Sequence, residues 1–471
     1  MNIIGRQREI HLLDRCEHSG KPEFVAVYGR RRVGKTFLIS EHFHNHFTFS
    51  VSGVANMGNS VQLNTFYAAL RNHFHGDITA PDDWFSAFGI LEDMLERDPA
   101  RERKVLFIDE MPWLDTPKSG FLSALEHFWN SFASKRPDIM LIVCGSAASW
   151  MIRNLIDNYG GLHDRVTERI VLEPFTLGES EDFFRSRNIV FTRRQIAEAY
   201  MILGGIPYYL DSMDRMFGLN QNIDILLFEK NAKLGGEFDR LYHSLFRHAE
   251  NHIRLVAALS GNNSGLTRQE LSKKSGMSDG GGLSKALKEL ESCGLISQSR
   301  DIARRRNGDY FRLVDYYTLF YFKYLHNRRG WDPRFWTNYL TDPAHRNGCG
   351  YAFERVCAAH LPQIMRKLGI SGVITDTYAF RSSGGKPGAQ IDLMIDRKDD
   401  TINLCEIKYR NAPYELTQGD IDDLERRKEV FIRETGTKKS IHQTMIAACG
   451  LVPNAYRNEI QAEITLDDLF L

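Results

Sequence analysis

The sequence lacks any apolar run of the roughly 18 residues that a membrane span needs, although 42% of its 471 residues are hydrophobic. Its seven cysteines are odd in number and form no C-x-x-C pair, so neither a disulfide framework nor a zinc site is indicated. Net charge is also absent, because 60 basic residues balance 60 acidic ones, and any nucleic-acid surface must therefore be local. The first six residues lead into charged sequence without a signal-peptide segment. We expect a cytoplasmic protein without membrane spans.

Residues 29–36 form a glycine-containing loop between an apolar strand at 24–28 and helical sequence from Phe37 onwards. In that context the glycines let backbone N–H groups surround an anion, and the helix dipole, a lysine and a threonine add to phosphate and Mg²⁺ binding. We therefore predict that ATP binds here and that Thr36 contributes to a Mg²⁺ site. The loop matches G-x-x-x-x-G-K-T and reads Gly29-Arg30-Arg31-Arg32-Val33-Gly34-Lys35-Thr36.

A second apolar strand, at 104–108, ends in two carboxylates, Asp109 and Glu110. Parallel α/β sheets bind ligands at the carboxyl ends of their strands. Asp109 is therefore a candidate to hold Mg²⁺ and Glu110 to polarise the attacking water. The alternative is an ordinary capped strand end, but the position after an intact phosphate loop favours the chemical roles.

Strands and helices alternate through this region, which predicts a doubly wound parallel sheet. The strand that ends at Ser146 places a hydroxyl beside the γ-phosphate, where a sensor role and a structural role are equally supported. Arg165 is the candidate to contact a phosphate in its own or a neighbouring subunit, with Arg169 in reserve; the second case requires a homo-oligomer. The further strands are expected at 47–51, 139–144 and 170–172, and the helices at 61–74, 84–95 and 121–132.

These motifs, in this order, resemble those of the AAA-type ATPases of the archaeal group. The resemblance includes the phosphate loop, a strand ending Asp-Glu, a strand ending Gly-Ser and the later run Gly204-Gly205-Ile206-Pro207. It covers roughly the first half of the chain. It implies an ATPase core over residues 1–180 and a helical lid over 181–245. The lid has no obvious arginine that would read the γ-phosphate.

Three alternating histidines, His42, His44 and His46, follow the phosphate-loop helix. On a strand they would share one face, as metal ligands do. No carboxylate or cysteine joins them in a metal-binding pattern, so we expect them to end a helix and open a strand.

Residues 246–325 carry the pattern of three short helices followed by a β-hairpin, which is the order of a winged helix. Such a domain contacts DNA through its third helix and its wing, or serves only as a packing module, in which case its leucines are simply core. The elements are helices at 252–259, after the capping box Thr267–Glu270 and at 283–293, with strands at 294–297 and 310–313. The basic candidates for DNA contact are Lys285, Lys288, Arg304, Arg305 and Arg306.

After a connector at 326–345, two apolar strands at 390–395 and 402–407 read as a hairpin that carries acids and a lysine. Glu406 and Lys408 share a face of their strand, and a tight turn centred on Asp399 places Asp392 opposite Glu406. Two carboxylates suit Mg²⁺ and a lysine can orient a nucleophile, so the cluster fits phosphodiester hydrolysis. Surface salt bridges are the alternative.

This pattern, an Asp followed by Glu-x-Lys on the next strand, resembles the restriction-endonuclease-like family. The resemblance covers residues 346–471 and matches the nuclease-like domain that follows many archaeal-type ATPases. It implies a role for an upstream helical acid, matched by Glu354, and metal binding by Asp392 and Glu406.

A chain of this length is expected to hold roughly three units. We therefore predict an α/β protein with a phosphate-loop parallel sheet, a helical lid, a winged helix and a restriction-endonuclease-like domain, acting on DNA with ATP and Mg²⁺. One alternative is a nucleotide-gated switch whose nuclease-like domain binds a partner without cutting. Another is a regulator that binds a promoter through the winged helix.

Overall fold

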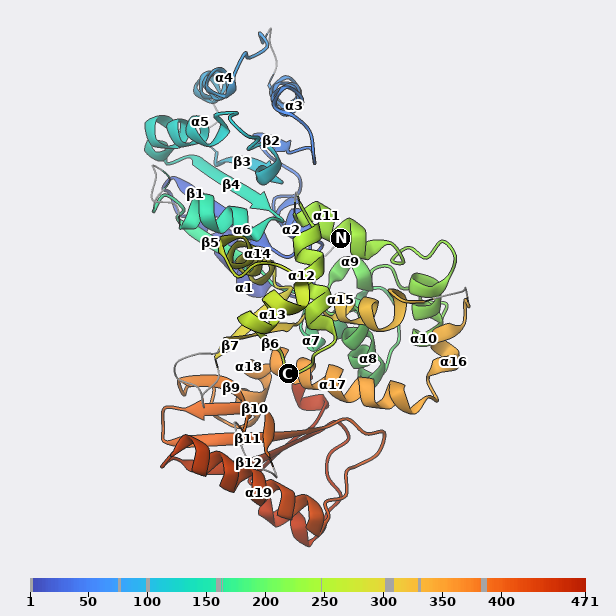
Figure 1. Cartoon of the computed structure of the whole chain (residues 1–471). Helices are drawn as coiled ribbons and strands as arrows, with labels where there is room; N and C mark the ends of the chain where they lie inside the picture. Colours follow the sequence, from blue (N-terminus) through green and yellow to red (C-terminus); the bar gives the residue numbers. More distant parts are fainter. Residues whose placement is uncertain are drawn as a thin grey trace. The chain divides into compact units, whose positions relative to one another are not determined.

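In the computed structural model, the chain forms two compact units. Helices and strands of both are labelled in Figure 1. The first unit comprises Met1–Pro174, Leu241–Ala249 and Lys288–Gly294, and the second comprises Phe175–Arg240, Glu250–Leu287 and Leu295–Leu471. The structure describes residues 3–74, 78–98, 102–157, 162, 164–246, 248–300, 309–328, 332–382 and 388–471. Within these ranges no helix combines the length and the apolar character that crossing a membrane requires.

A five-stranded sheet of order β2-β3-β4-β1-β5 forms the centre of the first unit. All of its neighbouring strands pair in parallel, so their carboxyl ends meet at one edge. The two strands β1 and β4 are buried along their whole length, as expected when helices cover both faces of a sheet. The predicted parallel α/β fold is therefore confirmed. The strands are β1 (Glu23–Gly29), β2 (Phe49–Ser52), β3 (Lys104–Asp109), β4 (Ile139–Gly145) and β5 (Glu168–Leu172).

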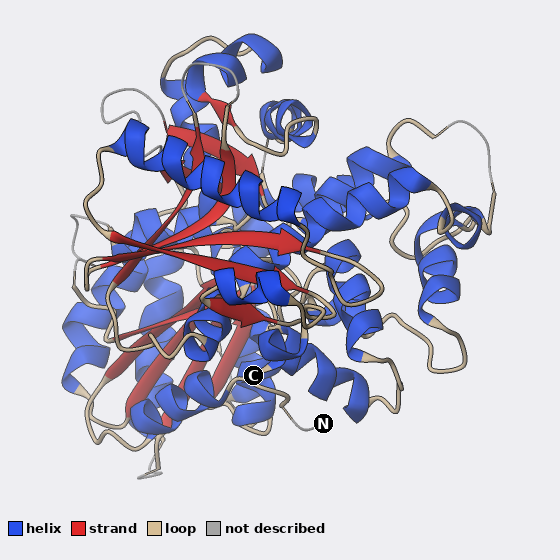
Figure 2. Cartoon of the chain, turned by 90° about the horizontal axis from the view of Figure 1, so that it is seen from below, coloured by secondary structure: helices blue, strands red, loops and turns tan. Residues whose placement is uncertain are grey.

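Helices connect these strands, and the alternation of helices with strands is visible in Figure 2. The predicted helix at 121–132 is present, but its second half is a π-helical turn. The helices are α1 (Gln7–Glu17), α2 (Lys35–His42), α3 (Asn59–His73), α4 (Trp84–Arg97), α5 (Phe121–His127) and α6 (Ala148–Met151). The shorter turns are η1 (Met111–Trp113), η2 (Phe128–Phe132), η3 (Ala133–Lys135) and η4 (Ile152–Ile156).

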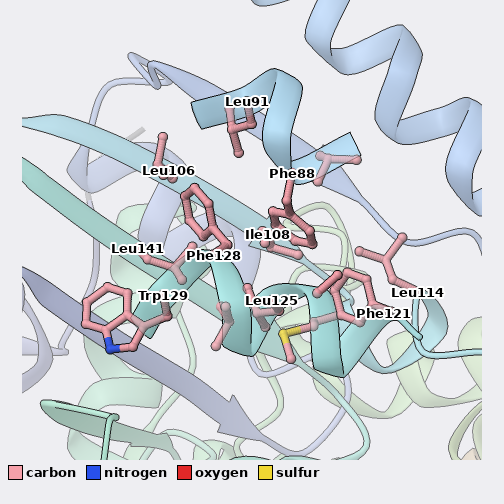
Figure 3. Packing of buried hydrophobic residues seen from close by; sticks show 14 of the residues in the cluster. Phe88, Leu91, Leu106, Ile108, Leu114, Phe121, Leu125, Phe128, Trp129 and Leu141 are labelled. Carbon is pink, nitrogen blue, oxygen red and sulfur yellow. The ribbon is translucent and has the colours of Figure 1, made fainter. Parts of the chain in front are cut away.

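Aromatic side chains dominate the core on one face of this sheet (Figure 3). The rings of Phe88 on α4 and Phe128 on η2 lie 5.2 Å apart between centroids, and Leu106 and Ile108 of β3 belong to the same buried cluster. Such large apolar side chains contribute most of the burial that stabilises a domain. This packing holds β3 and β4 in fixed register, and both strands lead to the candidate site.

Between residues 175 and 240 of the second unit, the regular secondary structure consists of helices joined by loops. Here the predicted Gly-Gly-Ile-Pro run has a packing role: the Phe175 N–H donates to the Gly205 carbonyl oxygen at 2.6 Å, and a Cβ on Gly205 would lie 1.9 Å from the Phe175 carbonyl oxygen. The elements are α7 (Leu177–Ser186), α8 (Arg193–Leu203), α9 (Pro207–Leu210), α10 (Leu219–Ile223), η5 (Asp224–Phe228) and α11 (Glu237–Leu245), whose last residues belong to the first unit.

Three helices and a small antiparallel sheet follow, in the order that the sequence indicates. Thr267 and Glu270 form the predicted reciprocal capping box at the start of α13. The sheet has the order β6-β8-β7, and residues 301–308 between its last two strands, which include Arg304, Arg305 and Arg306, lie outside the described residues. The elements are α12 (Glu250–Ser260), β6 (Leu266–Thr267), α13 (Arg268–Ser275), α14 (Gly281–Ser292), β7 (Ile296–Arg300) and β8 (Asp309–Leu313).

The C-terminal part of the second unit contains a mixed five-stranded sheet of order β13-β12-β11-β10-β9. The hairpin of β10 and β11 is antiparallel, as predicted, whereas β11 pairs in parallel with β12 after the crossover helix α19. Its strands are β9 (Thr375–Arg381), β10 (Gln390–Arg397), β11 (Thr401–Lys408), β12 (Ser440–Ala447) and β13 (Ala462–Ile464). The remaining elements are α15 (Tyr316–Phe320), η6 (Tyr321–Leu325), α16 (Phe335–Tyr339), α17 (Pro343–Ala359), α18 (Leu361–Lys367), α19 (Gln418–Thr435), η7 (Ala455–Glu459) and η8 (Asp467–Phe470).

We expect Gly205→Ala to destabilise the second unit by about 3 kcal/mol, the upper range for an overpacked site, because its methyl group would occupy the space of the Phe175 carbonyl. Gly350→Ala is the matched control, since its Cβ meets nothing within 4 Å in α17 and alanine favours a helix over glycine. Urea unfolding monitored by circular dichroism measures both. Equal midpoints for the two variants would show that the backbone contact at Gly205 is unimportant.

Candidate functional site

The phosphate loop joins the end of β1 to the start of α2, and Lys35 is the first residue of that helix. The Lys35 side chain is buried, and its Nζ donates to the carbonyl oxygens of Gly29 at 3.1 Å and Arg30 at 2.9 Å. An ammonium group has three N–H donors, so these two bonds hold it over the loop with capacity for one more acceptor. Gly34 has φ +90°, a conformation that glycine adopts without strain.

The close approach of β5 to the phosphate loop requires glycine at position 29. Its φ is +147°, and a Cβ there would lie 2.3 Å from the Leu172 carbonyl oxygen. The other predicted loop residues differ in exposure: Arg30 and Val33 are buried, whereas Arg31 and Arg32 are half-buried. The loop geometry is thus set by contacts with the sheet.

Thr36 and Asp109, the two predicted Mg²⁺ ligands of the first unit, lie side by side. The Thr36 hydroxyl donates to Asp109 Oδ2 at 2.9 Å, and the Glu110 backbone N–H donates to Asp109 Oδ1 at 2.9 Å. Asp109 is 8% exposed, and its pKa is raised, first by burial and then by the neighbouring Glu110 carboxylate. A buried, poorly solvated carboxylate beside a hydroxyl is a favourable place for a cation.

Glu110 and Ser146 also meet, which the sequence did not predict. Glu110 has φ +45°, an unusual conformation for a residue other than glycine. The Ser146 hydroxyl donates to Glu110 Oε1 at 2.7 Å, and the Ser146 N–H lies 3.4 Å from Oε2. The serine expected to sense the phosphate therefore holds the carboxylate expected to polarise water.

Arg165 is exposed and lies two residues before Thr167, whose N–H donates to the carbonyl oxygen of Phe24 near the start of β1. The phosphate loop follows the other end of β1, so the backbone of Arg165 lies near the opposite edge of the first sheet. Parts of the segment before it, residues 158–161 and 163, lie outside the described residues.

Glu406 and Lys408 form an ion pair on β11 in the second unit. Lys408 Nζ lies 2.7 Å from Glu406 Oε1, as expected for residues on one face of a strand. The other oxygen, Oε2, accepts from Arg427 Nη1 of α19 at 2.7 Å. Both oxygens of this carboxylate are thus bound by cations.

Asp392 lies on β10, one residue before Leu393. Leu393 pairs with Cys405, so Asp392 and Glu406 are the next residues along the two strands. Glu354 is half-buried on α17, which packs against β10 and β11. Gln418, at the start of α19, donates its amide to Asp422 on the same helix at 2.7 Å.

A tyrosine and an aspartate extend the surroundings of Lys408. The Lys408 ammonium lies 5.5 Å from the centre of the Tyr414 ring, and the Tyr414 hydroxyl donates to Asp420 at 2.7 Å. Burial, followed by the contact with Asp420, raises the pKa of Tyr414 to about 12. Tyr414 therefore stays a neutral hydrogen-bond donor at physiological pH.

Lys285 and Lys288 on α14 are both exposed, as expected for residues that contact DNA. Arg304, Arg305 and Arg306, the predicted wing residues, belong to the stretch that the structure leaves undescribed.

Two arginines near these sites were not predicted from the sequence. Arg6 is buried ahead of α1, and its Nη2 donates to the Val33 carbonyl oxygen of the phosphate loop at 3.4 Å. The pair Gly5-Arg6 before an amphipathic helix is a weak signal for it. Arg427 stands among many charged residues of α19, and no local pattern distinguishes it.

Comparison with known proteins agrees with the geometry of the first unit. Residues 3–213 match the family model of an ATPase domain predominantly from Archaea. An uncharacterized protein of Methanocaldococcus jannaschii is 23% identical over 419 residues, which are 87% of this chain and 88% of the relative. An uncharacterized ATP-binding protein of the same organism is 40% identical over 43 residues, 9% of this chain and 73% of the relative.

Solved structures give weaker likenesses. A Walker-type ATPase of Pyrococcus abyssi has a TM-score of 0.47 and 17% identity, and the alignment covers 68% of this chain and 96% of the other. The ORC2 protein of Aeropyrum pernix has a TM-score of 0.42 and 15% identity over 68% of this chain and 93% of the other. Scores at this level carry no argument about activity. Residues 3–213 are thus similar to the ATPase domains found predominantly in Archaea, and the buried Lys35 and the contact between Thr36 and Asp109 agree with that similarity.

Proposed function

We propose that this protein hydrolyses ATP with Mg²⁺ and acts on DNA through a winged helix and a metal-dependent, nuclease-like C-terminal domain. The observation that supports the DNA-directed part is the antiparallel hairpin of β10 and β11, in which Leu393 pairs with Cys405 and Lys408 forms an ion pair with Glu406. A reduced cytoplasmic location agrees with the seven cysteines, all of which are free.

The ATP site follows from the edge of the first sheet. Lys35 would give its third N–H to the outer phosphates, and the loop N–H groups together with the start of α2 would bind the remaining charge. Thr36 and Asp109 would hold Mg²⁺, which neutralises phosphate charge when bound. Their direct hydrogen bond supports this fit, because it already brings two oxygen ligands of the preferred kind together.

Glu110 is the residue that would act on the attacking water. A general base must have a fixed direction relative to its substrate, and Ser146 supplies that direction by donating to one carboxylate oxygen. Ser146 is thus a positioning residue. Arg165, exposed at the far edge of the sheet, would contact phosphate only in a neighbouring subunit of a homo-oligomer.

The case for DNA rests on the elements after residue 249, which belong to the second unit except for Lys288–Gly294. The order of α12, β6, α13, α14, β7 and β8 is that of a winged helix, with Lys285 and Lys288 exposed on the helix that enters the major groove in DNA-binding versions. In the C-terminal part, Glu406 lies on β11, which pairs antiparallel with β10 and parallel with β12 after the crossover helix α19. Helix α17 would supply Glu354 to the same cluster.

A nucleotide-gated switch is the second candidate, and one observation favours it. Both oxygens of Glu406 are bound by cations, Lys408 and Arg427. A divalent metal must displace at least one of them, so a domain kept in this state would bind a partner without cutting DNA.

Lys35→Ala should weaken ATP binding by roughly 10- to 100-fold, the change expected from losing a charge-assisted hydrogen bond.

Glu110→Gln should bind ATP normally but lower kcat by roughly 10²- to 10⁴-fold. Ser146→Ala should give a smaller loss of kcat with unchanged ATP affinity, since it removes only the hydrogen bond that orients Glu110. Isothermal titration and steady-state phosphate release measure the two quantities.

Lys135→Ala is the control for lost surface charge, because Lys135 is exposed and outside the loop. An unchanged ATP affinity in Lys35→Ala, or full turnover in Glu110→Gln, would contradict the assignment of the site.

Asp109→Asn should abolish Mg²⁺-dependent hydrolysis yet raise the Tm of the nucleotide-free protein, on the order of a few degrees. The folded-state pKa of Asp109 lies above its ordinary value of 3.8, so the stability linked to it is complete below that value and is lost as pH rises through the folded pKa. At pH 7 the charge opposes folding, and asparagine removes it.

Asp138→Asn is the control, because the expected change in Tm has the opposite sign. Hydrogen bonds from Arg136 hold the pKa of Asp138 below 3.8, so its charge favours folding above that value and asparagine should lower the Tm at pH 7. Calorimetry at pH 7 and pH 4 tests both signs, and a lower Tm in Asp109→Asn at pH 7 would show that its charge supports the fold.

DNA cleavage should require Asp392 and a divalent metal. Supercoiled, linear, branched and single-stranded DNA would be incubated with Mg²⁺ or Mn²⁺, with and without ATP, and analysed on gels. Asp392→Ala should lose at least roughly 10²-fold in rate, because metal-activated water is lost, whereas Asp399→Ala in the exposed turn of the same hairpin should cut normally.

Lys35→Ala then reports whether ATP gates the cutting. Absence of cleavage on every substrate, with ATP hydrolysis intact, would favour the switch. Equal cutting by the parent and Asp392→Ala would contradict the nuclease site.

A further inference from the structure

The first unit contains a second group of potential metal ligands, none of which belongs to the phosphate loop. Asp14 and Glu17 are three residues apart on α1, a spacing that places two side chains on one face of a helix. His42 is the last residue of α2. The ligand atoms of these three side chains all lie within 4.8 Å of one another.

His42 is the informative member of the group. Its side chain is 6% exposed, and among the described residues its Nε2 has no hydrogen-bond partner. Nε2 lies 3.7 Å from Asp14 Oδ1 and 3.7 Å from Glu17 Oε2, which is too far for a hydrogen bond. A buried nitrogen aimed between two carboxylates and bonded to neither requires an explanation.

We propose that Asp14, Glu17 and His42 form a binding site for one divalent transition-metal ion, with zinc as the best fit, and that water completes the coordination. In a tetrahedral zinc site the ligand atoms lie about 2.0–2.2 Å from the ion, and therefore about 3.4 Å from one another. The observed 3.7 Å separations need only a small contraction. Imidazole disfavours Ca²⁺ and Mg²⁺, which prefer all-oxygen sites.

The charges agree with a dication. Two carboxylates would balance Zn²⁺ while a neutral imidazole contributes a lone pair. Asp14 and Glu17 have side-chain exposures of 54% and 33%, so the ion has a route from solvent and positions for water ligands. The competing explanation is an imidazolium paired with two carboxylates, but the 3.7 Å separations are longer than the hydrogen bonds that such a pair forms.

His44 and His46, which the alternating pattern groups with His42, are not part of the cluster. His44 has φ +51° and is exposed, and β2 begins only at Phe49. The other two proposed ligands, Asp14 and Glu17, lie on α1, about 25 residues earlier in the chain than His42. Bound metal would join α1 to the end of α2, the helix whose first residues are Lys35 and Thr36.

Zinc titration of the full-length, chelator-treated protein tests this site. Isothermal titration with ZnCl₂ at pH 7.5 should find one equivalent in the parent that is weakened at least roughly 10- to 100-fold in His42→Ala and in Asp14→Asn. His44→Ala is the matched control and should keep it. Asp109→Asn should also keep it, which separates this equivalent from any zinc at the phosphate loop.

Two further readouts keep the test decisive. Zinc should raise the Tm of the parent and of His44→Ala, because an ion that binds only the folded state stabilises it, but not that of Asp14→Asn. Since the Asp14 side chain is largely exposed, this variant reports on the metal even if His42→Ala fails to fold. The same zinc affinity and Tm response in the parent and Asp14→Asn, or no zinc binding by the parent, would overturn the proposal in favour of an ion pair.

Discussion

The hydrogen bond from Thr36 to Asp109 connects the phosphate loop with the strand that carries the acidic residues, and the rest of the nucleotide site depends on it. It forms because β1, β3 and β4 are parallel and end at one edge, so residues that are 73 positions apart in sequence meet there. The aromatic core between α4, α5 and the sheet keeps those strand ends aligned. Binding chemistry in this unit is therefore a consequence of sheet packing.

The same edge concentrates groups that oppose folding. Asp109 is buried with a raised pKa, Glu110 has a left-handed backbone, and the Lys35 ammonium is removed from water. Each is unfavourable without a ligand, and a nucleotide bound with Mg²⁺, as proposed, would relieve the two buried charges at once. The same two buried charges would thus favour ligand binding and lower the stability of the protein without ligand.

Much of this arrangement was predictable from local sequence. The phosphate loop, the strand ending in Asp109-Glu110, the capping box at Thr267 and the β10–β11 hairpin all depend on residues close together in the chain. The contacts that local patterns missed are tertiary. Ser146 reaches Glu110 across 36 residues, Arg427 reaches Glu406 from another element, and His42 meets Asp14 and Glu17 of an earlier helix. The segment with Arg165 lies before β5, near the edge of the sheet opposite the phosphate loop, and its contact with a phosphate stays a prediction.

The two carboxylate sites differ in what already neutralises them. Among the described residues the donors to Asp109 are uncharged, namely the Thr36 hydroxyl, the Glu110 backbone N–H and the Cys144 thiol, and a second carboxylate lies beside it, so an incoming cation meets negative charge. Glu406 is bound by Lys408 and Arg427, so a metal must compete with two cations. DNA phosphate would attract those same two side chains, because both are natural phosphate ligands. Polyanion binding would then free Glu406, and metal binding at the C-terminal cluster should be favoured by DNA in a way that metal binding at Asp109 is not.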